Sequence, residues 1–406
     1  MKQNVLAVLL LSLLSIQFLN AQDAEPYRTP PQVLIDLLLA NPTPTIQIDS
    51  KGEWMLLTER NSYPTVEELG QPELRVAGLR LNPNNFGPST GRQSFINSFR
   101  LKNIKTNQFY SVSGLPENLL AGMFTRNPSE TKIGFTHTTG TRIDIYVVDL
   151  ATMTATRINQ QPLNAVMGAP FVWLDDETIL YKSAIYPASS APKRSITPEG
   201  PTVQQNLGKA APSRTYQDLI KSPFDERLFE FYATSQLIKN KNGKEEKFGA
   251  PAIYSRVSVS PDRQYVLTET VRKPFSYLVS ASGFPTQLSI SDTQGNVIKV
   301  LAELPSTEGS PTGFDNLQNR PRGFSWRDDE PSTIVWSHPL DSGMISKQVE
   351  YRDVVYALSA PFTGEPKELF RTKMRFRSIT WGNKTFALFS EGLTGKQLTR
   401  LNKLNP

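Results

Sequence analysis

One short pattern recurs along the chain and constrains its fold more than any other feature. Each copy has an apolar or aromatic pair, a tight polar turn containing Asp or Asn, and a second apolar run. Asp and Asn favour such turns because their side chains bond the nearby backbone. Apolar runs on both sides of the turn are typical of a β-hairpin. The six turns lie at residues 49–52, 126–130, 175–176, 260–263, 327–329 and 382–384.

The spacing of the copies predicts the architecture. It runs from roughly 45 to 90 residues, which suits the blades of a β-propeller with insertions. The 31 prolines are spread along the chain and disfavour long helices. We therefore predict an all-β fold, a β-propeller of about six repeat units over residues 46–406 that forms an incomplete ring. An array of β-sandwiches is the alternative.

Two helical segments interrupt the strand pattern. The first is predicted at about residues 32–40, capped by residues 29–31, in an N-terminal segment over residues 22–45. The second opens at Ser222 and would place Phe224, Leu228, Phe231 and Ser235 on one face. It closes an insertion predicted at about residues 187–251, and long propeller insertions often bind partners.

The N-terminus has the features of a secretory signal peptide over residues 1–21. Lys2 precedes an apolar run at residues 5–19, and small Ala21 offers a cleavage point. A membrane anchor is the alternative, although polar residues interrupt the short run. The chain has no cysteine, which excludes disulfides and a lipoprotein anchor. We expect a secreted or periplasmic protein, cleaved after Ala21 and without a membrane anchor.

Several catalytic and binding patterns have simpler structural interpretations. Residues 87–91 spell G-x-S-x-G, but loop-forming residues surround Ser89, so we expect a turn and no catalytic residue. His137 and His338 have no ligand spacing, so we expect structural histidines, no metal and no cofactor. The acidic pairs 175–176 and 328–329 suit turns. The net charge of +6 is not gathered into a run, which disfavours nucleic acid as a partner.

Longer sequence segments resemble one protein family. They include residues 72–83, 113–116, 171–176, 215–219, 274–277 and 351–353, and they follow the family's order along nearly the whole mature chain. In these segments the chain resembles the prolyl oligopeptidase family of serine peptidases, specifically its glutamyl endopeptidase branch. The resemblance implies an N-terminal propeller and a C-terminal α/β-hydrolase domain with the catalytic triad. The chain stops at Pro406 without that domain, so we expect it to be inactive alone.

The resemblance also implies a role and partners. The propeller would gate and select peptide or protein substrates for the absent hydrolase domain. An acidic substrate side chain needs a cation, and Arg214 and Arg227 in the insertion are the candidates. One alternative is a stand-alone secreted propeller that binds a partner without catalysis. Another is a dipeptidyl-peptidase-like exopeptidase, because Asp225 and Glu226 weakly resemble the acidic pair of those enzymes.

Overall fold

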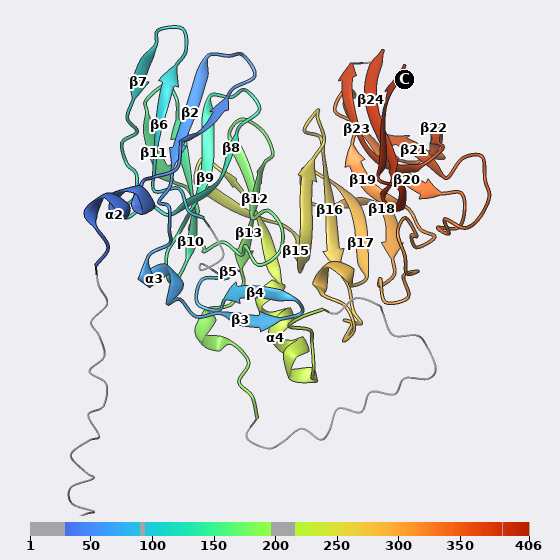
Figure 1. Cartoon of the computed structure of the whole chain (residues 1–406), viewed down its shortest axis with the longest axis horizontal. Coiled ribbons are helices and arrows are strands. Elements are labelled where there is room, and N and C mark those ends of the chain that lie inside the picture. Colours follow the sequence, from blue (N-terminus) through green and yellow to red (C-terminus); the bar gives the residue numbers. More distant parts are fainter. Residues whose placement is uncertain (1–28, 90–93, 196–215, 384, 406) are drawn as a thin grey trace, which may run out of the picture.

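The computed structural model describes residues 29–89, 94–195, 216–383 and 385–405. The predicted signal peptide and Arg214 lie outside these residues. Within them the fold is all-β, as predicted, and its antiparallel sheets follow one another along the chain (Figure 1). No helix in the described part is long and apolar enough to cross a membrane.

Four of the sheets are separate units, and a fifth connects two units. The first sheet contains β1 (Thr45–Ile48), β2 (Trp54–Glu59), β6 (Ser98–Asn103) and β7 (Gln108–Tyr110). The second contains β8 (Ala121–Arg126), β9 (Lys132–Thr138), β10 (Ile143–Asp149) and β11 (Thr154–Arg157). Towards the C-terminus lie β19 (Arg322–Trp326), β20 (Thr333–Pro339), β21 (Asp353–Ser359) and β22 (Lys367–Thr372), and then β23 (Arg375–Asn383), β24 (Phe386–Leu393) and β25 (Leu398–Leu404).

The central sheet joins two four-stranded meanders through one long strand. Its members are β12 (Phe171–Trp173), β13 (Thr178–Ala184), β14 (Ser235–Lys241), β15 (Lys244–Val259), β16 (Tyr265–Val271), β17 (Thr286–Asp292) and β18 (Val297–Leu304). The first part of β15 pairs with β14 as far as Ala252, and the part from Ile253 pairs with β16. Each half therefore has the up-and-down order of a propeller blade.

All six predicted turns join paired strands. They connect β1 to β2, β8 to β9, β12 to β13, β15 to β16, β19 to β20, and β23 to β24. The repeat therefore marks the first hairpin of each meander, which confirms the hairpin prediction. The number of blades and the closure of the ring stay predictions.

These turns also connect neighbouring sheets. The carboxylate of Glu130 accepts from the backbone N–H of Ser50 at 3.0 Å, which links the second sheet to the first. Asp176 in turn accepts from the backbone N–H of Ser129 at 2.7 Å. Further along, the guanidinium of Arg327 lies 4.1 Å from the centre of a Trp381 ring. Polar residues in the turns thus hold successive sheets together.

The apolar core is divided among the interfaces between successive sheets. One cluster joins the first and second sheets through Leu56, Phe99, Leu101, Ile133, Phe135 and Val148. A second cluster joins the second sheet to β12 and β13 through Ile145, Phe171, Ile179 and Tyr181. A third joins β16 and β17 to β19 and β20 through Leu267, Ile290, Phe324 and Ile334. Face-to-face packing of consecutive sheets is how a propeller buries its core.

Both predicted helices are present, with corrections at their ends. α2 (Gln32–Leu39) is capped by Pro31, without a side-chain cap from Thr29. α4 (Pro223–Ala233) begins after Ser222, whose hydroxyl accepts from the backbone N–H of Asp225 at 3.3 Å. Ser235 is wrong as a member of the helical face, since it begins β14. The remaining helical elements are α3 (Val66–Leu69), η3 (Ala188–Ser190), η4 (Ala281–Gly283) and η5 (Thr394–Lys396).

The predicted insertion at residues 187–251 extends too far at its C-terminal end. β14 pairs along its whole length with β13, so the insertion ends before Ser235. Asn242 and Gly243 form the turn from β14 to β15 with φ of 50° and 84°. Asn-Gly favours positive φ at both positions, as a tight hairpin requires. The surrounding lysines and glutamates nevertheless give this segment the composition of a solvated loop, which explains why the predicted insertion extends too far.

Candidate functional site

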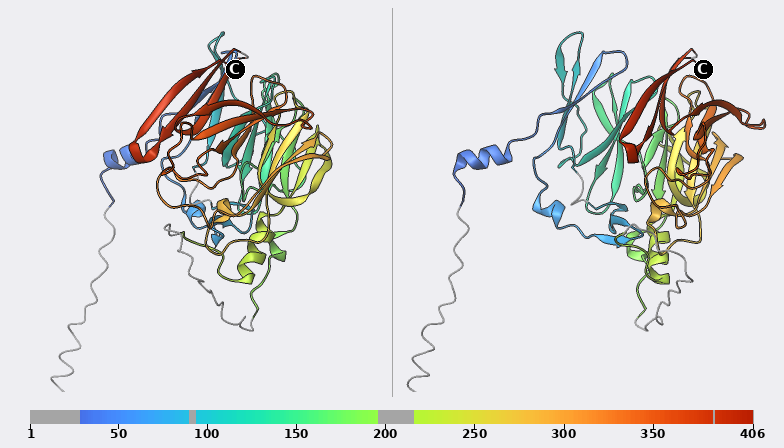
Figure 2. Two further views of the ribbon diagram at one scale, coloured as in Figure 1. Left: turned by 90° about the vertical axis from the view of Figure 1, so that its right-hand side faces the viewer. Right: turned by 45° about the vertical axis from the view of Figure 1, so that its right-hand side comes forward.

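The connections between sheets and strands gather on one face because of the meander topology. In an antiparallel meander the first and third turns lie on one face, and the middle turn and the exit lie on the other. The described parts of the long connections all belong to the second face, here called the insertion face; they are residues 60–89, 94–97, 185–195, 216–234, 272–285, 305–321 and 340–352. Figure 1 shows the short sheet of β3 (Leu74–Val76), β4 (Leu79–Asn82) and β5 (Gly87–Pro88) beside α4 below the blades, and Figure 2 shows the same from two further sides.

The insertion face has an apolar core of its own, centred on α4. Phe229 is fully buried and meets the rings of Phe275 at 4.9 Å and Phe284 at 5.4 Å, both edge to face. The same cluster includes Val76 and Leu81 from the short sheet. Three separate connections thus pack into one layer, which fixes the position of α4.

Polar contacts connect this layer to the end of the insertion. Arg80 donates through Nε to a carboxylate oxygen of Asp218 at 3.0 Å and through Nη2 to Gln217 at 3.0 Å. The backbone N–H of Gly78 donates to the carbonyl oxygen of Asp218 at 2.8 Å. Beside these contacts is a cavity of about 890 Å³, lined by residues 216–221 together with Arg75, Tyr277 and Leu278.

Arg227, one of the two predicted substrate-binding cations, lies on the insertion face. It is exposed on α4, and its guanidinium lies 5.7 Å from the centre of the Phe224 ring. The other candidate, Arg214, lies outside the described residues. The carboxylate of Asp225 accepts from the backbone N–H of Lys221 at 2.9 Å, which is a helix-capping contact.

Ser89 lies in an extended segment rather than in a turn. The turn occupies residues 83–86, one strand earlier, because Gly87 and Pro88 pair with β4 as β5. The backbone N–H of Ser89 continues that pairing to the carbonyl oxygen of Arg80 at 2.9 Å, and the residue is 5% exposed. The position of the predicted turn is therefore corrected, and the buried serine follows a short antiparallel strand.

The two histidines have structural contacts. His137 is buried on β9, and its Nδ1 accepts from the backbone N–H of Leu120 at 3.3 Å. Burial lowers the pKa of His137, and nearby Asp144 opposes this shift. His338 Nδ1 lies 3.1 Å from the carbonyl oxygen of Pro339 on β20. Within the described residues, no group of three or more His, Cys, Asp or Glu side chains could hold a metal ion.

One member of each acidic pair makes a contact within its own turn. Asp175 accepts from the backbone N–H of Glu177 at 2.8 Å, within its own turn. Asp329 takes a fork of two bonds from Arg327, at 2.7 and 3.0 Å. The carboxylates of Asp175 and Asp329 therefore stabilise their own turns.

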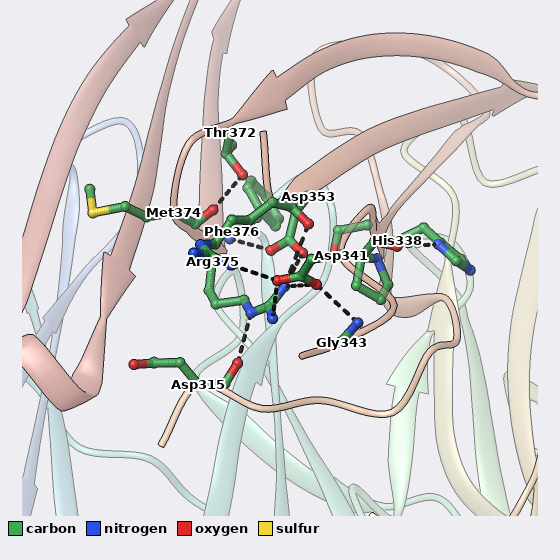
Figure 3. Close-up of polar contacts among 12 residues, drawn as sticks. Asp315, His338, Asp341, Gly343, Asp353, Thr372, Met374, Arg375 and Phe376 are labelled. Carbon is green, nitrogen blue, oxygen red and sulfur yellow. Dashed lines mark hydrogen bonds and ion pairs between the residues drawn. The ribbon is translucent and has the colours of Figure 1, made fainter. Parts of the chain in front are cut away.

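A buried charge cluster on the insertion face was not predicted from the sequence (Figure 3). Arg375 is 2% exposed and makes a two-bond fork to Asp341 at 2.9 and 2.7 Å. It also reaches Asp353 at 3.1 Å, and both carboxylates are fully buried. Arg352 adds a bond to Asp341 at 2.9 Å, and Arg322 adds one to Asp353. Of these residues, only Arg352 and Asp353 belong to a segment that carries the family resemblance.

Comparisons with known proteins agree with the sequence resemblance. No family model matches the chain. The probable chloroplastic glutamyl endopeptidase of Arabidopsis thaliana is 29% identical over 400 residues, which cover 94% of this chain and 41% of that protein. Its counterpart in Oryza sativa subsp. japonica is 27% identical over 397 residues, with shares of 94% and 42%. The chain is therefore similar in sequence to two probable glutamyl endopeptidases. It spans about two fifths of the length of these relatives.

Solved structures provide further comparisons for this glutamyl endopeptidase relative. An acylaminoacyl peptidase of Pyrococcus horikoshii is 11% identical with a TM-score of 0.41, and the match covers 91% of this chain and 45% of that one. A putative TolB of Agrobacterium tumefaciens is 9% identical with a TM-score of 0.31, with shares of 82% and 81%.

Proposed function

We propose that this chain is the β-propeller portion of a glutamyl-endopeptidase-like serine peptidase, where it gates and selects peptide substrates. The observation that carries the proposal is the similarity over 94% of the chain to about two fifths of the glutamyl endopeptidases. The catalytic triad would then belong to a hydrolase domain outside the residues of this chain, and that domain and the peptide substrate are the proposed partners.

The insertion face supports this proposal. Its own apolar core holds α4 in a fixed position, and a cavity of about 890 Å³ opens beside it. A rigid face with a cavity can exclude folded proteins and admit extended peptides. Arg227 on α4 and Arg214 stay the proposed cations for an acidic substrate side chain, since a guanidinium binds a carboxylate through two bonds.

A chimera tests the proposed function. The chain would be joined to the portion of the Arabidopsis relative that it does not match, and the product assayed with peptides containing Glu or Gln. We expect cleavage after Glu in short peptides and little cleavage of the same segment within a folded protein. Arg227→Ala at a true selector should weaken transition-state binding of the Glu peptide by about 2 to 4 kcal/mol and lower its kcat/KM accordingly, with far less effect on the Gln peptide.

A fluorophosphonate probe provides the control. It should label the added portion of the chimera, and Ser89→Ala should leave the labelling unchanged because Ser89 is buried in the short sheet. Labelling that disappears in Ser89→Ala would show that this serine is the nucleophile. Equal cleavage of the free and the folded segment would show that the propeller does not gate.

We also propose that the protein is exported. The expected product begins at Gln22, because cleavage after Ala21 removes the charged start and the apolar run. Mass spectrometry of the protein recovered from the periplasm or the medium checks this terminus. A membrane-bound product that retains residues 1–21 would favour the anchor instead.

A further inference from the structure

The buried charge cluster of the insertion face carries an excess positive charge. Arg322, Arg352 and Arg375 share two carboxylates, those of Asp341 and Asp353. One positive charge is therefore not balanced inside the cluster. Arg375 and both carboxylates are buried, whereas the side chains of Arg352 and Arg322 are 14% and 24% exposed. The excess charge therefore lies at the partly exposed edge of the cluster, where it favours an anion near whichever guanidinium keeps unused donors.

Asp315 does not supply that balance, although it lies next to the cluster. Its backbone carbonyl accepts from Arg375 Nε at 2.8 Å, but its carboxylate is used elsewhere. The carboxylate oxygens accept from Arg377 at 3.1 Å and from the backbone N–H groups of Thr394 and Gly395 at 2.8 and 2.9 Å.

The unused donor belongs to Arg322. Its Nη2 donates to Asp353, while its Nη1 is buried and has no hydrogen-bond partner among the described residues. The amide oxygen of Gln318 is likewise buried without a partner among these residues. Both residues line the same cavity. Buried polar atoms without partners are rare. The Arg322 donor calls for an acceptor, such as an anion or ordered water, whereas the Gln318 oxygen calls for a donor, such as water.

This cavity is suited in size and lining to a small polar group. It has a volume of about 400 Å³ and lies between the connections at residues 279–283 and 307–318, within the usual range for ligand sites. Arg320 adds a second guanidinium, which uses Nη1 to bond the carbonyl oxygen of Pro305 at 2.6 Å. Hydroxyl groups of Ser282 and Thr307 also line the cavity, and Glu308 lines it with an exposed side chain.

We propose that this cavity binds a carboxylate group through Arg320 and Arg322. A carboxylate carries one negative charge, which matches the single excess charge of the cluster, and accepts hydrogen bonds from two guanidinium groups. Its source is either the acidic side chain of a peptide or a small free carboxylic acid. The peptide source rests on the proposed function, whereas the site itself rests on the geometry of the cavity.

Calorimetric titration of the full chain tests the site with three probes. N-acetyl-glutamate methylamide presents an acidic side chain, butyrate presents the free acid, and N-acetyl-glutamine methylamide is the neutral control. We expect carboxylate binding with a dissociation constant on the order of 1 mM and no saturable binding of the glutamine probe. Tighter binding of the glutamate probe than of butyrate assigns the peptide source, and binding of butyrate alone assigns the free acid.

Substitutions locate the binding. Arg320→Gln and Arg322→Gln should each weaken it about 10-fold or more, because each removes a charged hydrogen bond. Arg320→Gln is the safer variant, since Arg322 also holds Asp353. The matched control is Arg371→Gln on β22, whose exposed guanidinium pairs with Glu368 at 2.8 Å outside the cavity.

The proposal would be overturned if Arg320→Gln and Arg371→Gln bound the carboxylate probes equally well. Equal binding of the glutamate and glutamine probes, or no saturable binding of either carboxylate, would also overturn it. These outcomes are independent of the chimera. A chimera that cleaves after Glu with an empty cavity would refute only the carboxylate site, and an inactive chimera with a filled cavity would refute only the proposed function.

Discussion

Lys182 occupies a position where a charged side chain is unfavourable. It lies on β13 between Tyr181 and Ser183 and is 2% exposed. Its ammonium group donates to the carbonyl oxygens of Met167 and of Tyr254, the latter at 3.4 Å. These carbonyls carry no charge, so burial lowers the pKa of Lys182 from 10.5 to about 7. At the residue scale, the protonated form of Lys182 therefore destabilises the folded state near neutral pH.

The stability of the protein should rise with pH because of this lysine. Between pH 7 and the unfolded pKa of 10.5, the unfolded state binds more protons at Lys182 than the folded state does. The free energy of unfolding should therefore increase by about 2 kcal/mol between pH 7 and pH 9 relative to Lys182→Met. Chemical denaturation at both pH values measures the difference.

A control variant separates this effect from the other titrating groups. Lys241 is exposed at the end of β14, so Lys241→Met should follow the same pH dependence as the unmodified protein. Parallel pH profiles for the unmodified protein and Lys182→Met would show that the buried ammonium does not control the slope.

At the scale of elements, local chemistry predicted the hairpins better than it predicted the boundaries. Turns that contain Asp or Asn are predictable because these side chains bond the nearby backbone, as Asp49, Asp175 and Asn383 do. Side chains also bond the nearby backbone at the start of α3. The Thr65 hydroxyl accepts from the backbone N–H of Glu68 at 3.2 Å, and the Glu68 carboxylate accepts from the backbone N–H of Thr65 at 2.5 Å. This Thr-x-x-Glu capping box is a local pattern that is visible in the sequence.

The buried charge cluster could not be found from local patterns. Arg322 begins β19, Asp341 lies in the connection after β20, and Arg375 begins β23, so only the packing of β19 to β23 brings them together. Each of them alone looks like a surface residue, as arginine and aspartate usually are. The same holds for Arg320, whose cavity exists only where two connections meet.

At the scale of the whole molecule, the sheets form a series of nearest-neighbour interfaces. Each main cluster of the blades combines strands that follow closely in the chain, and each turn contact connects a sheet to the next. In arrays where each unit contacts its neighbours, stability is approximately a sum of local terms. The effect of a core mutation should therefore decrease with distance along the series.

Phe135→Ala tests how far such an effect extends. Phe135 is 0% exposed and lies 5.4 Å from Phe99 and 5.6 Å from Tyr146, measured between ring centres. Its removal leaves a cavity that should cost about 3 to 5 kcal/mol. We expect hydrogen exchange to accelerate in β1 to β11 and to stay close to its original rate in β16 to β22.

Ile290→Ala, at the β17 interface, is the matched variant, because Ile290 is also 0% exposed. It should produce the mirror pattern, with faster exchange in β16 to β22 and little change in β1 to β11. Uniform acceleration over all sheets in both variants would mean that the molecule opens as one cooperative unit, since local openings then cost more than global unfolding. The two exchange maps together therefore measure whether the sheets depend on their neighbours or on the complete array.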